Sequence, residues 1–177
     1  MDFITTLHSW QNFYFMVGGA SAGLIGLMFV ALSLGIHLVN EQTLSQMEAF
    51  ATPSVIYFAS TLLIACTMLV PDYLPLFLGV ILFLGGIAGL LRSRSHIRQL
   101  VKVALQYRDF TLWDWLSQII FPALSYVLLL VGGMSFVVEQ WSLAFAGVWA
   151  ASILLLVCGI ANTWSLVIWI VQHSQPS

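Results

Sequence analysis

Five long apolar runs, separated by short polar segments, dominate the pattern along the chain. Each run meets or approaches the roughly 20 apolar residues that a helix needs to cross the hydrocarbon core of a bilayer. Helices are the only option, because open strands in lipid would leave backbone groups without hydrogen bonds. The pattern predicts an all-α membrane protein with about five transmembrane helices in a single helical-bundle domain, residues 1–177. The expected spans are 13–38, 49–70, 74–91, 115–138 and 142–171.

Composition agrees with a membrane environment. The chain has 177 residues, of which 60% are hydrophobic and 7% are charged, with a mean hydropathy of +0.99. Soluble domains carry roughly 25% charged residues. A soluble fold of this length has too little polar surface to cover so many apolar side chains, so the surplus is expected to face lipid or a partner.

The basic residues set the expected orientation. All five lie between the third and fourth runs, and positively charged loops remain in the cytoplasm. Counting spans from that loop places the N-terminus outside and the C-terminus in the cytoplasm, across a bacterial inner (plasma) membrane. The connections at 71–73 and 139–141 are very short and predict antiparallel neighbours on either side. The five basic residues are Arg92, Arg94, Arg98, Lys102 and Arg108.

The basic segment itself has helical periodicity. Arg94, Arg98 and Lys102 recur every four residues, and apolar side chains from Ile97 to Leu105 fall on the other side. This pattern is typical of a short amphipathic helix near 94–108 lying on the anionic cytoplasmic leaflet, where it contacts anionic lipids. The alternative is a plain loop that only sets the topology.

The first run contains a seam of small residues. Gly19 and Gly23 form a GxxxG pair, and the same face continues through Gly26 to Ser33. Small residues let helix backbones approach closely, which is how packing energy arises in lipid. The seam therefore predicts close helix packing, either inside the monomer, between copies in a homo-oligomer, or along a pore.

Buried charge is absent from the five runs, which argues against ion-coupled transport and voltage sensing. The polar residues near the cytoplasmic ends instead suggest a vestibule, with simple interhelical hydrogen bonding as the alternative. Pro122 is expected to kink the fourth helix. The vestibule residues would be His37, Glu48, Asp114, Gln118 and Asn162.

Catalytic and metal-binding motifs are missing, and the four histidines are scattered among different segments. Cys66 and Cys158 each lie in an apolar run without the spacing of a metal site or a disulfide framework. The net charge of −2 gives no general attraction to nucleic acid. We therefore expect neither an enzyme nor a cofactor, a metal or a nucleic-acid partner.

The first run, FYFMVGGASAGLIGLMFVALS from Phe13 to Ser33, resembles the opening segment of a group of small, uncharacterised bacterial inner-membrane proteins. The resemblance implies a bacterial source and no particular activity. Two functional hypotheses remain. One is a homo-oligomeric channel or passive pore assembled through the glycine seam. The other is a non-conducting accessory or scaffold subunit of a larger membrane complex.

Overall fold

The computed structural model describes residues 3–35, 41–71, 74–106 and 119–173, with side chains described outside 41–50, 95–106 and 169–173. This part of the chain is built from helices alone, as predicted. Four helices are long and apolar enough to cross a membrane, and the fifth is shorter and equally apolar. The helices are α1 (Phe3–Gly35), α2 (Glu41–Leu69), α3 (Pro75–Gln106), α5 (Phe121–Val137) and α6 (Trp141–His173).

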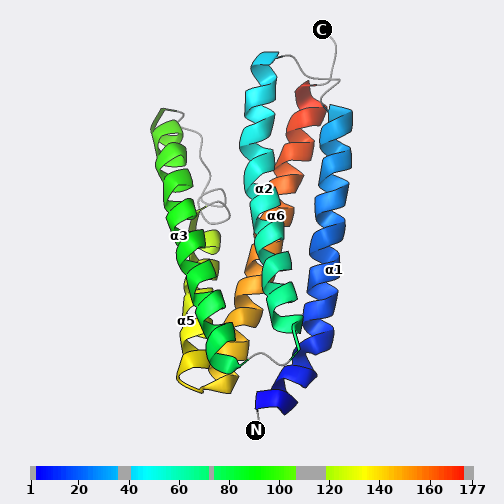
Figure 1. The fold of residues 1–177 in the computed structure, drawn as a ribbon. Coiled ribbons are helices and arrows are strands. Elements are labelled where there is room, and N and C mark those ends of the chain that lie inside the picture. The colour runs from blue at the N-terminus through cyan, green and yellow to red at the C-terminus, as the bar shows by residue number, and fades with distance from the viewer. Residues whose placement is uncertain (1–2, 36–40, 72–73, 107–118, 174–177) are drawn as a thin grey trace.

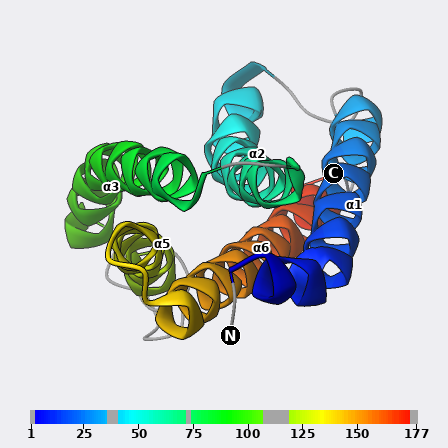
Figure 2. The same cartoon turned by 60° about the horizontal axis from the view of Figure 1, so that its bottom comes forward.

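Helix α6 lies at the centre of the bundle. It packs against α5 on one side and against α2 and α1 on the other, while α1 pairs with α2 and α3 pairs with α5 (Figures 1 and 2). Its inward face is fully buried, and small and larger side chains alternate along it. The buried residues of that face include Ala144, Val148, Ala151, Leu155 and Leu166.

The short connection between α2 and α3 does not make these helices a packed pair, contrary to the sequence prediction. They run antiparallel (Figure 1), yet their backbones come close at few positions, and buried side chains such as Met68 and Leu78 fill the space between them in the core. The reason is that the glycines of α3 let its backbone pack directly against α5. A Cβ atom added at Gly79 would lie 2.7 Å from the Gly133 carbonyl oxygen, and one at Gly133 would lie 2.9 Å from the Gly79 oxygen. Backbones this close leave no freedom for α3 to pack on α2 instead.

The connection between α5 and α6 behaves as predicted, and its geometry is that of a Schellman cap. The Gln140 amide donates to the Ser135 carbonyl at 2.9 Å, and the Glu139 amide donates to the Phe136 carbonyl at 3.4 Å. Glu139 has the left-handed backbone, φ 60°, that this cap requires. The two helices then pack closely, because a Cβ atom at Gly147 would lie 3.1 Å from the Gly132 Cα.

Two helix ends differ in detail from the sequence prediction. The helix expected near 94–108 is present as far as Gln106, but it forms the last turns of α3 and is not a separate element. Pro122 stands in the first turn of α5, which begins at Phe121 directly after two residues in π-helical conformation, and the part of the chain before residue 119, on which the predicted kink depends, lies outside the described residues. A first-turn proline is well tolerated because the amide it lacks would have no partner within the helix.

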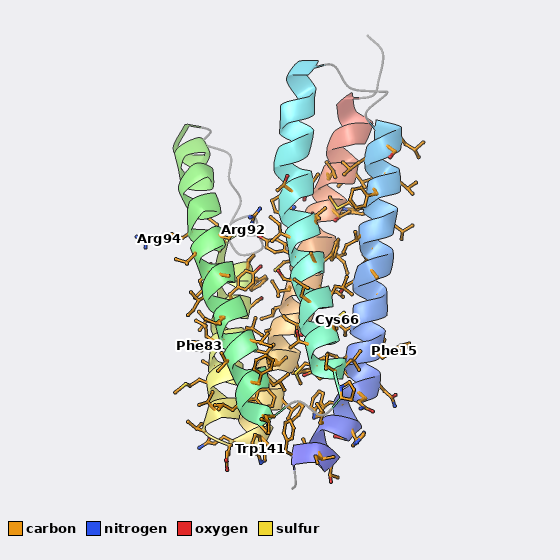
Figure 3. The ribbon with its side chains drawn as sticks, viewed as in Figure 1. Phe15, Cys66, Phe83, Arg92, Arg94 and Trp141 are labelled. Carbon is orange, nitrogen blue, oxygen red and sulfur yellow. The ribbon has the colours of Figure 1, made fainter. Side chains whose placement is uncertain are left out.

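Aromatic rings close the end of the bundle that carries the N-terminus. Trp10 stacks on Phe145 with ring centroids 6.1 Å apart, and Phe136 meets Phe145 edge-on at 5.2 Å. Phe3 contacts Trp141, labelled in Figure 3, at 5.1 Å. The start of α1 is thereby attached to the α5–α6 turn.

Candidate functional site

The glycine seam of α1 faces away from the bundle. We call Gly19, Gly23, Gly26 and Ser33 the α1 ridge; all four are exposed. A Cβ atom added at any of its three glycines would meet no described atom within 4 Å. The Ser33 hydroxyl donates to the Phe29 carbonyl of its own helix at 2.8 Å. Within the described part of the chain, these glycines therefore do not pack inside the monomer, contrary to that alternative from the sequence.

The opposite face of α1 carries the contacts with the bundle. Tyr14, Val17, Ser21 and Met28 are buried there, at the spacing of one helical stripe. Gly18 also belongs to this side, since a Cβ atom on it would lie 3.1 Å from the Ala65 Cβ of α2. The inward and outward glycines of α1 are thus separated by their position around the helix and not by their sequence context.

Most glycines elsewhere in the bundle are used internally, which sets the α1 ridge apart. At seven of these positions, an added Cβ atom would come within 3.1 Å of an atom from a neighbouring helix. Such glycines already provide the close contact that small residues allow in lipid. Gly85 of α3 is the exception, since it is exposed and an added Cβ atom would lie 4.0 Å from the Leu129 Cδ2. The internally packed glycines of α3, α5 and α6 are Gly79, Gly86, Gly89, Gly132, Gly133, Gly147 and Gly159.

A second feature lies where α2 and α3 diverge. We call it the α2–α3 cleft. It contains a small pocket of about 20 Å³, lined by Pro53, Ile56 and Tyr57 of α2, Gly89, Arg92 and Ser93 of α3, and Tyr126 of α5. Arg92 extends from α3 toward α2, whereas Arg94 points away from the bundle (Figure 3).

The floor of the α2–α3 cleft is held by a polar contact between helices. The hydroxyl groups of Ser60 in α2 and Tyr126 in α5 are hydrogen-bonded at 3.2 Å. This contact bridges the α1–α2 pair and the α3–α5 pair on the side where α2 and α3 do not pack. Sequence reasoning did not find the cleft, because nothing in the sequence brings Tyr126 to Tyr57 and Arg92. Its only local signal is the arginine at the end of an apolar run.

The predicted polar vestibule is only partly covered by the described residues. His37, Asp114 and Gln118 lie outside them, as does the side chain of Glu48. Asn162 is described, and its amide donates to the Ser54 hydroxyl of α2 at 2.8 Å. The alternative interpretation, interhelical hydrogen bonding, is confirmed for this residue.

The predicted basic residues can be followed as far as Arg94. Arg92 and Arg94 are exposed part-way along α3, which continues to Gln106. Arg98 and Lys102 lie in the continuation of this helix, but their side chains are outside the described part, and Arg108 is outside it altogether. The basic stripe predicted for Arg94, Arg98 and Lys102 therefore remains a prediction beyond Arg94.

Two buried hydroxyl groups on the inner face of α1 have no hydrogen-bond partner among the described residues. They belong to Tyr14 and Ser21, and both side chains are fully buried. Cys158 is also buried, and Cys66 is exposed; both are free thiols. No three His, Cys, Asp or Glu side chains in the described segments lie close enough together to hold a metal ion.

Replacing Tyr14 with phenylalanine is expected to stabilise the bundle by about 1 kcal/mol, because it removes a buried hydroxyl that makes no hydrogen bond to any described residue. The matched change is Tyr126→Phe, which breaks the bond to Ser60 and should destabilise by about 0.6 kcal/mol. Unfolding of the purified variants in mixed detergent micelles measures both. A loss of stability in Tyr14→Phe as large as that in Tyr126→Phe would contradict the assignment of an unpaired hydroxyl.

The chain matches no protein-family model, no curated protein and no solved structure. Its class is therefore defined by the fold and the two surface features together. It is an all-helical membrane protein with several spanning helices, one of which presents an unpacked glycine ridge.

Proposed function

We propose that this protein is a small homo-oligomeric channel or passive pore, assembled through the α1 ridge. The observation that carries the proposal is the open space around Gly19, Gly23 and Gly26. Glycine lowers the intrinsic stability of a helix by about 1 kcal/mol per residue relative to alanine. In lipid, that cost is offset where a second helix packs into the groove. Within the monomer, no described atom fills this position.

A one-sided ridge is compatible with a closed ring. If the ridge of one copy packs against a different face of the next, the contact is head-to-tail, and it closes into a ring where the rotation between copies is a whole fraction of a turn. In the proposed ring the α1 helices surround the central axis. In the described spans, the only charged residues are Arg92 and Arg94, at the end of the span Pro75–Arg94. Such a pore would therefore select by size and by neutral polar groups.

The orientation we propose places the C-terminal end of α3 in the cytoplasm of a bacterial cell, with the protein in the inner membrane. It is supported by the arrangement of the chain. The N-terminal end of α1 and the two short turns lie at one end of the bundle, and the basic end of α3 lies at the other with the C-terminal end of α6 (Figure 1). Positive residues are retained on the cytoplasmic side.

An accessory or scaffold subunit is the second candidate, and the same ridge favours it. A helix of another membrane protein would fill the groove as well as a second copy would. The two functions differ in what occupies the ridge. An accessory subunit would be monomeric alone in mild detergent and would co-purify in fixed stoichiometry with its partner.

The deciding experiment measures mass and conductance on the wild-type protein. We expect a defined homo-oligomer by native mass spectrometry from nanodiscs, and ion or small-solute flux after reconstitution into planar bilayers. A well-folded oligomer with no conductance under any ion, pH or membrane tension would overturn the pore. A monomer at all protein concentrations would overturn self-assembly and leave the accessory role.

A further inference from the structure

We propose that helices α3 and α5 form an arm that pivots against a body made of α1, α2 and α6, and that the Ser60–Tyr126 hydrogen bond latches the arm closed. The pivot lies at the turn end of the bundle, where the two short turns are, and the movement occurs toward the far end. This device goes beyond the proposed assembly and does not rest on it, because it uses no residue of the α1 ridge. The observation that carries it is a buried core divided into two clusters, with this hydrogen bond at their boundary.

The buried core joins all five described helices at the turn end only. A second cluster, nearer to the far end, consists of Met28 of α1, Ala51 and Phe58 of α2, and Leu166 of α6. None of its members belongs to α3 or α5. The arm is therefore packed into the shared core near the turns and takes no part in the buried core toward the far end. The turn-end cluster draws on every helix, and its members include Tyr14, Met68, Leu78, Phe136 and Phe145.

The arm and the body are each closely packed within themselves. In the arm, a Cβ atom added at Gly79 would lie 2.7 Å from the Gly133 carbonyl oxygen. In the body, the Asn162 amide of α6 donates to the Ser54 hydroxyl of α2 at 2.8 Å, and a Cβ atom added at Gly159 would overlap the Phe58 ring. Packed helices do not deform continuously, so a movement between them displaces the arm as one rigid unit.

Tyr126 lies where the shared core ends. It is buried and belongs to the turn-end cluster. Its ring lies directly against α3, because a Cβ atom added at Gly89 would overlap it. Its hydroxyl reaches the body, where it is hydrogen-bonded to the Ser60 hydroxyl of α2 at 3.2 Å. Beyond this contact the α2–α3 cleft begins, and α2 and α3 diverge toward the far end (Figure 1). The bond therefore joins the arm to the body at the edge of their common core.

Opening of the arm separates Tyr126 from Ser60 and leaves the five-helix cluster near the turns intact. Hydrogen bonds between helices in lipid are individually weak, so the open form is a minor state that exchanges with the closed one. Loss of the bond should raise the ratio of open to closed molecules about threefold. The open form widens the α2–α3 cleft and gives the far side of the bundle access to the Ser60 and Tyr126 hydroxyls.

The test measures distances between pairs of spin labels in the full-length protein in lipid nanodiscs, by double electron–electron resonance. Labelled protein is diluted with unlabelled protein, so that every distance lies within one copy. Cysteines not used for a label are replaced with alanine. The far-end pair is Thr52 of α2 and Leu91 of α3, and the turn-end pair is Cys66 of α2 and Leu76 of α3; all four positions are exposed.

The far-end pair of the wild type is expected to show a main distance and a minor, longer one, and the turn-end pair a single distance. Tyr126→Phe and Ser60→Ala should each raise the share of the longer distance about threefold. The double variant should raise it no further, because both changes remove the same bond. Ser125→Ala is the matched control. The Ser125 hydroxyl donates to the Phe121 carbonyl of its own helix at 2.7 Å, so its loss removes a buried hydroxyl from α5 without breaking a contact between arm and body, and the wild-type distribution should remain.

Three results would overturn the latch. Far-end distances in Tyr126→Phe and Ser60→Ala that match the wild type would show that the bond does not hold the arm. Equal broadening of the turn-end pair would indicate general loosening of the bundle and not a pivot. A shift in Ser125→Ala as large as that in Tyr126→Phe would show that any lost hydroxyl has the same effect. Each result is independent of oligomeric mass and conductance, so failure here is distinguishable from failure of the proposed pore.

Discussion

Gly133→Ala is expected to destabilise the bundle by about 3 kcal/mol, the upper part of the range for overpacked cores. The new methyl group would lie 2.7 Å from the Phe83 backbone nitrogen and 2.9 Å from the Gly79 carbonyl oxygen of α3. Both are backbone atoms of a packed helix, so neither can move aside as a flexible side chain would. This steric overlap can be relieved only if α3 and α5 move apart. Equilibrium unfolding in mixed detergent micelles measures the loss.

Gly23→Ala is the matched control, because it makes the same chemical change in open space. An added Cβ atom at Gly23 meets no described atom within 4 Å, and alanine is the better helix former. Monomer stability should therefore stay constant or rise slightly. If Gly133→Ala unfolds at the same denaturant concentration as the wild type, the close packing of α3 on α5 is not the one described above.

Gly23→Leu is expected to weaken self-association at least about tenfold, equivalent to 1.4 kcal/mol, while leaving the monomer folded. The added side chain projects from the middle of the α1 ridge into the space that a second helix would occupy. Small-residue contacts depend on close backbone approach, which a leucine prevents. Energy transfer between labelled copies in liposomes, measured over a range of protein-to-lipid ratios, gives the association constant.

Ala88→Leu provides the comparison, since it places an equally large side chain on an exposed position of α3. It should leave the association constant unchanged. If Gly23→Leu oligomerises as the wild type does, the ridge is not the interface between copies. If instead it fails to fold even as a monomer, the outward position of the ridge is wrong.

The five helices can be predicted from the sequence, because a bilayer demands long apolar runs and such runs are visible without knowing any contact. Which face of each helix points into the bundle cannot be predicted in this way. Helix α1 is apolar almost all round, so inward Gly18 and outward Gly19 look alike in the sequence, and only the position of α2 distinguishes them. Periodicity separates the faces of a helix in water, but it fails where both faces are apolar.

Helix neighbours were the second limit on prediction from sequence. A short connection fixes direction, and it correctly made α2 and α3 antiparallel, but it did not decide packing. Glycines from a distant part of the chain decided it, through the contact of Gly79 with Gly133. The same limit applies to single residues. Asn162 was recognisable as a polar group inside a span, but its partner Ser54 lies 108 residues away, and no local pattern identifies it.

The central position of α6 has a consequence for how the protein is made. Helix α6 follows the other four along the chain, so it leaves the ribosome after them. By then the α1–α2 pair and the α3–α5 pair can each have formed within the membrane, because each pair has its own extensive contacts. Direct contacts between the two pairs are few beside those that each makes with α6, although they include the Ser60–Tyr126 hydrogen bond. Helix α6 therefore supplies most of the packing that joins the two pairs. Assembly therefore depends on the helix that is synthesised after the other four described ones, and a nascent chain stalled before residue 141 would expose two incompletely packed helix pairs to the membrane's quality-control proteases.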